Sequence, residues 1–320
     1  MYPDIISLGE LLVEIMREKR DVPHGQIGSI YRGPFPSGAP AIFIDTAARI
    51  GKPFNLSTGF IGVIGNDEFG NCILIKLKQD DVDTSQIRIT NELTTGIAFN
   101  QYDSDGSRKF IFAQGAAGET SEEDIKKAYF KKIKNLHIMG SALSISKKSR
   151  DACYKAVKLA KEYNPKVVIS FDPNLRPELL SLKTILEISK PLLETTEILL
   201  PSGEEAENLS GVKGPIKACQ KLLEMGPKII VLKEGYEGST VFTSEEFNGI
   251  KVNGFKVVEK DPTGAGDCFG GAFIVGYLAG WKLQKIARFA NAVGALKVRS
   301  FGPMPNTSYE EVIAMMKNFD

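Results

Sequence analysis

The sequence predicts an α/β fold built around a mostly parallel sheet. Its second half contains short apolar runs of strand length, which begin at Asn135 (NLHIMGS), Lys166 (KVVIS), Glu197 (EILLPS) and Lys228 (KIIVLKEG). Segments with helical spacing separate these runs. SRDACYKAVKLAKEYN forms an apolar stripe from Ala152, Ala156, Val157 and Ala160, and TSEEDIKKAYFKKI opens with Ser121 and Asp124 spaced as in a capping box. Strands that alternate with helices favour a parallel sheet.

The first third of the chain follows a different pattern. TTGIAFNQYDSDGSRKFIFAQG, from Thr94, predicts two strands joined by a turn at residues 103–106, and GQIGSIYRG, from Gly25, predicts another short strand. We interpret these pieces as a small antiparallel β lid, inserted at about residues 15–35 and 94–115. No repeat or linker divides the chain, so we expect a single domain over residues 1–320.

The composition excludes several classes of protein. A net charge of +1 gives no strong field for attracting nucleic acid or an anionic membrane. The sequence has no apolar run of about 20 residues, and its start lacks the pattern of a signal peptide. The four cysteines are scattered and form no CxxC pair. We therefore expect a cytoplasmic protein that binds neither nucleic acid nor a membrane.

One motif carries chemistry. Residues 261–273 read DPTGAGDCFGGAF, with small residues at Gly264, Ala265 and Gly266, followed by Asp267 and an apolar helical run. Unpaired amides and the dipole make a helix N-terminus a site for anions, and small residues let a phosphate approach. Asp267 would repel a phosphate unless it accepts a proton from an attacking hydroxyl. The alternative is a Gly-rich turn with a helix-start acid.

The motif closely resembles the C-terminal signature of the ribokinase-like, or PfkB, family of sugar kinases. Further stretches resemble the family's motifs in their family order: ISLGELLVEI, PSGAPAIFIDTAARIG, GFIGVIGNDEFG, DPNLRPEL, LPSGEEAENL, VLKEGYEG and ANAVGALKVRSFG. The resemblance implies a ribokinase-like three-layer α/β core with a β lid. It also implies that ATP with Mg²⁺ donates its γ-phosphoryl group to a sugar hydroxyl.

The resemblance also implies roles for single residues. Asp267 would be the catalytic base beside the anion hole of Gly264, Ala265 and Gly266, with Arg176 on the phosphates. The residues expected along the nucleotide are Asn174, Arg176, Lys233, Gly235, Gly238 and Asn291. Those expected at the sugar are Glu14, Gly38, Ala39, Phe99 and Gln114. Glu205 would organise Mg²⁺ through water, and Asp261 and Thr263 are candidates for holding K⁺.

Some of these residues have simpler readings. Arg176 would equally be a surface arginine that follows a turn. Glu205 would be a solvated acid at a helix start, and Lys233 would be a lysine that extends from a strand end into solvent. Glu14 is harder to dismiss, because an acid in an apolar strand needs donors such as sugar hydroxyls.

The chain departs from the family pattern at the sugar and metal sites. Ile42 and Ser202 stand where asparagines are common. Gln114 stands where keto-deoxygluconate kinases carry an arginine for the acid's carboxylate, although Arg108 or Lys109 would supply a charge in a shifted register. The motif forms look closest to those of tagatose and fructose kinases. We therefore expect a neutral ketohexose, with 2-keto-3-deoxygluconate, a nucleoside, or a catalytically silent sugar-binding regulator as alternatives, and a homodimer formed through the lid.

Overall fold

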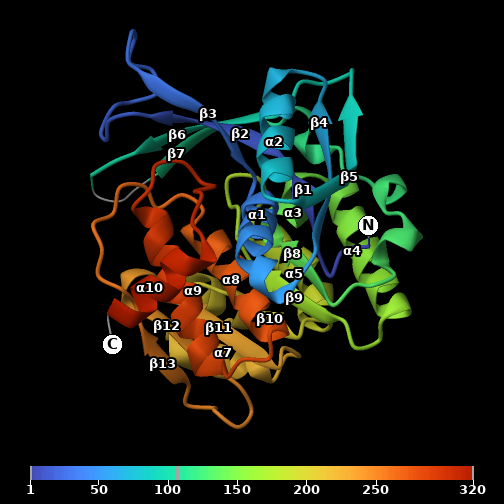
Figure 1. Cartoon of the computed structure of the whole chain (residues 1–320), viewed down its shortest axis with the longest axis vertical. Helices are drawn as coiled ribbons and strands as arrows, with labels where there is room; N and C mark the ends of the chain where they lie inside the picture. The colour runs from blue at the N-terminus through green and yellow to red at the C-terminus, as the bar shows by residue number, and fades with distance from the viewer. Residues whose placement is uncertain (1, 105–107, 319–320) are drawn as a thin grey trace.

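A computed structural model describes residues 2–104 and 108–318 (Figure 1). Its main sheet has the strand order β13-β12-β11-β10-β9-β8-β1-β4-β5 within these residues. The pairs from β11 to β5 are all parallel, while β12 and β13 add an antiparallel edge. The strands are β1 (Ile5–Glu10), β4 (Thr58–Gly65), β5 (Val82–Thr90), β8 (Asn135–Met139), β9 (Val168–Asp172), β10 (Ile198–Leu199), β11 (Ile229–Lys233), β12 (Gly238–Phe242) and β13 (Ile250–Asn253). The predicted mostly parallel sheet is confirmed.

Helices cover both faces of this sheet. Successive strand residues point to opposite faces, so Ile5 and Ile6 of β1 belong to two separate apolar cores. The first core packs against α1 (Ala39–Gly51), α2 (Glu68–Gln79), α8 (Ala265–Leu278), α9 (Leu283–Val298) and α10 (Tyr309–Asn318). The second packs against α3 (Gly140–Ile145), α4 (Lys147–Tyr163), α5 (Leu182–Leu193), α6 (Gly203–Ser210) and α7 (Pro215–Leu223). The three-layer architecture is confirmed, and in the described residues no helix is long and apolar enough to cross a membrane.

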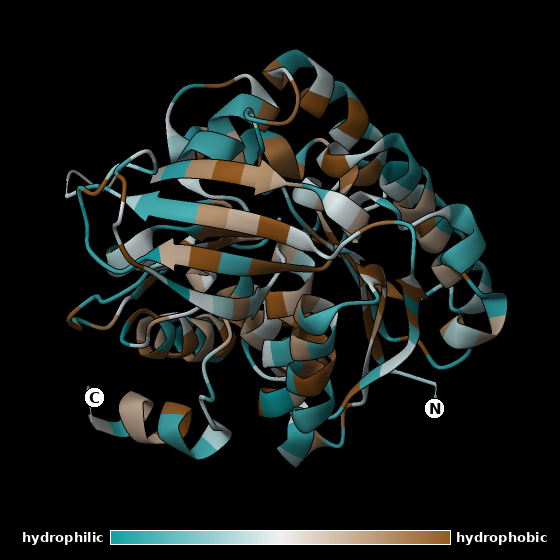
Figure 2. Ribbon diagram, turned by 90° about the horizontal axis from the view of Figure 1, so that it is seen from above, coloured by the Kyte–Doolittle hydropathy of each residue, from teal (hydrophilic) through white to brown (hydrophobic). Residues whose placement is uncertain are grey.

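A second, smaller sheet has the order β3-β2-β6-β7 and lies across one end of the core (Figures 1 and 2). Its strands are β2 (Leu12–Arg17), β3 (Tyr31–Ser37), β6 (Gly96–Tyr102) and β7 (Arg108–Ala113). The pairs β2–β3 and β6–β7 are antiparallel, as predicted, but the central pair β2–β6 is parallel. β2 follows β1 almost directly, so one short sequence supplies strands to both sheets.

Two local predictions are wrong. Residues 25–30 form turns, and the strand predicted there begins only at Tyr31. The segment after Ser121 is not an α-helix but two 3₁₀ turns, η3 (Glu122–Asp124) and η4 (Lys127–Phe130). Its capping box does form, but Ile125 then turns to φ −83° and ψ 94°, which ends the helical path. The predicted turn at 103–106 lies partly outside the described residues.

The stripe predicted between Ser149 and Asn164 is confirmed. All four of its apolar residues are buried in α4, namely Ala152, Ala156, Val157 and Ala160. The helix begins after Ser146, whose hydroxyl accepts the amide of Ser149. Here the period of the sequence and the packing of the fold agree, because one face of the helix lies on the sheet.

Helix α8 packs very closely on α1. A Cβ atom added at Gly271 would lie 2.6 Å from the carbonyl oxygen of Phe43 in α1, so a side chain there would push the two helices apart. Gly294 in α9 differs, because an added Cβ would meet only the carbonyl oxygen of Ala265, at 3.7 Å.

These two glycines provide a matched test of the packing. We expect Gly271→Ala to destabilise the protein by roughly 1–3 kcal/mol through overpacking, despite the better helix propensity of alanine. Gly294→Ala should instead stabilise it by up to about 1 kcal/mol. Urea unfolding of both variants measures the difference, and equal effects of the two substitutions would contradict this account.

Candidate active site

The N-terminus of α8 is formed by the small residues predicted for the anion hole. Gly264 caps the helix at φ 78°, a left-handed conformation that favours glycine, and an added Cβ would crowd Ile42 at 3.1 Å. The amide of Ala265 already donates to the carbonyl of Pro262, at 3.1 Å. The amides of Gly266 and Asp267 follow in the first helical turn, where no intrahelical partner exists. They are therefore the donors best placed for an anion.

Asp267 lies in that first turn and is 8% exposed. Burial, together with the nearby carboxyl groups of Glu10 and Glu14, raises the pKa of its carboxyl group to about 6. The positive charges of Lys233 and Arg176 oppose this rise. A carboxyl group with a pKa near neutrality can both accept and release a proton at physiological pH, as a general base must.

Lys233 reaches the same helix end from the carboxyl end of β11. Its Nζ lies 2.5 Å from Oδ2 of Asp172, at the end of β9, and would lie 3.5 Å from a Cβ on Gly266. Burial lowers the pKa of Lys233, but the carboxylates of Asp172 and Glu205 outweigh that effect and raise it overall. Lys233 is therefore an ammonium group held beside the N-terminus of α8, rather than a solvated strand-end lysine.

The loop that follows β9 carries Asn174 and Arg176. Asn174 adopts φ 37°, and its buried side-chain oxygen has no hydrogen-bond partner. Glu205 fixes this loop, because one carboxylate oxygen accepts the amide of Leu175 and the other accepts the amide of Ser202. Glu205 thus has two roles, because it caps α6 and also positions the loop that carries Arg176. It is therefore more than a solvated acid at a helix start.

Glu14 defines the opposite wall of the site, on the second sheet. It is 7% exposed, and its carboxylate accepts the hydroxyl of Ser37 at 2.6 Å and the side-chain amide of Asn100. Burial raises its pKa to about 7. Gly38, with φ 112°, begins α1 next to this group, and an added Cβ would collide with the carbonyl oxygen of Glu10.

Several predicted site residues lie elsewhere or are already engaged. Phe99 alternates with Asn100 along β6, so it lies on the other face of the lid, against Tyr31. The Gln114 side chain lies against Gly118. Asn291 donates its amide to the carbonyls of Val252 and Asn253, which ties α9 to β13. Gly235 and Gly238 form the turn between β11 and β12. A Cβ atom added at Gly238 would collide with the carbonyl oxygen of Val252.

Arg108 and Lys109 were the charged alternatives to Gln114, and only the Lys109 side chain is described. Lys109 forms an ion pair with Asp103 at 3.2 Å, and it pairs in register with Gln101, on the same face as Phe99. The Arg108 side chain is outside the described residues. Lys109 therefore does not face Glu14.

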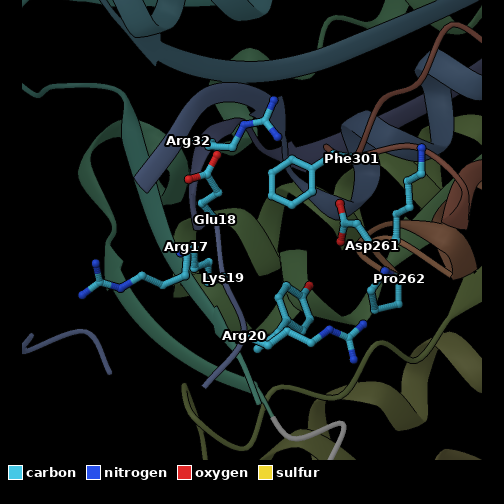
Figure 3. Close-up of a pocket in the computed structure, with 10 residues that line it drawn as sticks. Arg17, Glu18, Lys19, Arg20, Arg32, Asp261, Pro262 and Phe301 are labelled. Atoms are coloured by element: carbon cyan, nitrogen blue, oxygen red, sulfur yellow. The ribbon is translucent and has the colours of Figure 1, made fainter. Parts of the chain in front are cut away.

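A cavity of about 240 Å³ lies between the lid and the loop that precedes α8 (Figure 3). Asp261, Pro262 and Phe301 are among the residues that line it, together with Arg20 and Arg32. None of the residues around Asp267 described above lines it. This cavity is therefore separate from the group of residues around Asp267.

Four residues of this site were not predicted from the sequence. Asp172 and Glu10 each end a buried parallel strand, and ligands bind at this edge of such sheets, so that position was an available signal. Ser37 and Asn100 gave no signal, because only the pairing of β2 with β3 and β6 brings them to Glu14.

This arrangement of an acid, two cations and a helix N-terminus defines a phosphoryl-transfer type of site on an α/β sheet. The model of the pfkB family of carbohydrate kinases matches residues 4–309, so the chain belongs to that family.

Individual relatives agree with this assignment. An Arabidopsis thaliana protein named "Probable fructokinase-6, chloroplastic" is 31% identical over 97% of this chain and 81% of its own. An E. coli structure, a "putative Ribokinase II in complex with ATP and Mg+2", is 38% identical with a TM-score of 0.90 and covers 99% of both chains. A Vibrio cholerae O395 fructokinase double mutant "in fructose, ADP and potassium ion bound form" is 25% identical with a TM-score of 0.82, over 98% of this chain and 99% of that one.

The protonation of Asp267 predicts a pH dependence. Only the ionised carboxylate accepts a proton, so kcat/KM should fall as the pH drops through about 6. Arg176→Gln should move this limb to higher pH, because the positive charge of Arg176 is one of those that lower the pKa of Asp267. Steady-state kinetics across pH measure both profiles. A limb that moved to lower pH in Arg176→Gln would contradict the assignment.

Proposed function

We propose that this carbohydrate kinase transfers the γ-phosphoryl group of ATP to a hydroxyl of a neutral ketohexose, fructose or tagatose. The observation that carries the proposal is the position of Asp267, which is buried at the N-terminus of α8. The positive charges of Lys233 and Arg176 lower the pKa of its carboxyl group. The similarity to proteins named fructokinase supports the substrate class. A silent sugar-binding regulator would not need a carboxylate in an anion-binding helix end.

Each group has a role in the transfer. The Asp267 carboxylate takes the proton of the sugar hydroxyl as the hydroxyl oxygen forms its bond to phosphorus and the bond from phosphorus to the ADP oxygen breaks. The amides of Gly266 and Asp267 and the ammonium of Lys233 stabilise the charge on the transferring phosphoryl oxygens. Arg176 is partly exposed, at 31%, and would reach the phosphates of the nucleotide.

The residues present fit ATP with Mg²⁺. Mg²⁺ usually binds through substrate phosphates, waters and one or two carboxylates rather than in a protein cage. Within the described residues, no group of three or more acidic, histidine or cysteine side chains is placed so that it could hold a metal ion. Asn174 offers an unpartnered buried oxygen, and Glu205 and Asp172 offer carboxylates beside it. When bound, Mg²⁺ would neutralise charge on the phosphates.

A neutral sugar fits the charges around Glu14. The carboxyl groups of Glu10 and Glu14 lie close enough to Asp267 to raise the pKa of its carboxyl group. A sugar acid would add one more negative charge, and a poorly paired charge in a partly dry site is costly. Sugar hydroxyls instead donate to Glu14, which is already held by Ser37 and Asn100.

A substrate panel tests the proposal. We expect kcat/KM for fructose or tagatose to exceed that for 2-keto-3-deoxygluconate and for nucleosides, measured side by side. Asp267→Asn should lower turnover by roughly 10²–10⁴ while leaving ATP binding and folding intact, because it removes only the base. A clear preference for the acid would reject the neutral substrate and point to Arg176 as the anchor. An Asn variant that kept more than about a tenth of the activity would reject the base.

We also propose that residues 1–320 act as one cytoplasmic kinase domain and that two copies pair through their lids. The four free cysteines suit a reducing compartment. Register places Ile15, Phe99 and Ile111 on the lid face opposite Glu14. Ile111 is 52% exposed there, and an apolar face of this kind requires a cover.

The pairing predicts a dimer at micromolar concentration by light scattering. Ile111→Lys should shift the protein toward the monomer, because it places a charge in the apolar interface. Ile216→Lys is the matched control, since Ile216 is 54% exposed but lies on α7, away from the lid. A wild-type monomer, or equal effects of the two variants, would reject the lid interface.

A further inference from the structure

Lys297, near the end of α9, is a fully buried lysine that the sites described above do not use. Its side chain is 0% exposed. Its Nζ lies 2.7 Å from the carbonyl oxygen of Asp261, 3.2 Å from Oδ2 of the same residue and 3.3 Å from the carbonyl oxygen of Ser300. An ammonium group has three N–H donors, so these three oxygens satisfy it.

Asp261 is the residue expected to hold K⁺ together with Thr263, and it is 2% exposed. Its Oδ1 accepts the amide of Thr263 at 2.9 Å and the hydroxyl of Thr263 at 2.6 Å. Its Oδ2 accepts the amide of Gly302 at 2.8 Å and the ammonium of Lys297. A carboxylate has about four lone-pair sites, so no oxygen of Asp261 remains for a metal ion.

The balance of charge around Asp261 also argues against a bound K⁺ ion. Lys297 and Asp261 form a buried ion pair in which one positive charge neutralises one negative charge. A K⁺ ion beside them would be a second, unpaired cation in a buried place, which is costly. The residues that line the adjoining cavity add further repulsion, because five of them are basic, namely Arg17, Lys19, Arg20, Arg32 and Lys260, against the two acids Glu18 and Asp261.

We propose that the Lys297 ammonium is a built-in monovalent cation that holds the loop before the anion hole, so that this kinase takes no K⁺ at Asp261 and Thr263. Asp261 begins the turn that leads to Gly264, where the amide of Ala265 donates to Pro262. The amides of Lys260 and Asp261 also donate to the carbonyl of Val298, so the end of α9 fixes this loop from two sides. Lys297 is thus a positioning residue for the donors of Gly266 and Asp267.

The unchanged protein gives the first test. We expect the same melting temperature and the same kcat/KM in KCl, NaCl and choline chloride at equal ionic strength. A saturable rise of either quantity with K⁺ alone would overturn the proposal. The melting temperature needs no turnover, so this result stands apart from any failure of the proposed substrate.

Two variants give the second test. Lys297→Ala removes the ammonium and leaves the oxygens of Asp261 and Ser300 around a hole. KCl or NH₄Cl should therefore raise its melting temperature and restore kcat/KM, whereas choline chloride should do neither. Lys297→Met fills the hole without a charge and should not respond. A folded Lys297→Ala that ignores both ions, or an equal response of both variants, would contradict the proposal, and if neither variant folds the comparison of salts on the unchanged protein decides alone.

Discussion

The whole site depends on keeping the Asp267 carboxylate ionisable in a buried place. Burial alone would hold this group protonated, and its pKa stays near 6 because Lys233 and Arg176 lie close enough to oppose the desolvation. Neither cation is near Asp267 in the sequence. Lys233 arrives from the end of β11 and Arg176 from the loop after β9, so the parallel sheet is what brings them to α8.

The carboxyl groups around Asp267 limit what the site can accept. Burial raises the pKa of Asp172 and of Glu14 to about 7, although Lys233 opposes the rise at Asp172 and Ser37 opposes it at Glu14. The site therefore holds acids that are only partly ionised near neutral pH. A ligand that brings hydroxyl donors on one side and a metal-neutralised phosphate on the other suits this balance better than an anion on both sides.

Local sequence signals succeeded where packing and periodicity agree and failed where the tertiary structure overrides them. The stripe on α4 was predictable because its face lies on the sheet, and the strand runs were predictable because both of their faces are buried. The segment after Ser121 has a real capping box, yet Ile125 leaves the helical path and is buried in the second core. A cap specifies where a turn begins but not how many turns follow.

The sequence by itself determined the α/β class, the helix start at Gly264 with Asp267 behind it, and the order of the family motifs, because each depends on neighbours in the chain. Only the tertiary structure decided what depends on distant segments. The parallel pairing of β2 with β6 placed Asn100 on Glu14 and turned Phe99 to the other face, and no local pattern specifies such a register. Burial likewise joined Lys297 to Asp261 across the fold, because a charge taken out of water must find an opposite charge wherever the chain supplies one.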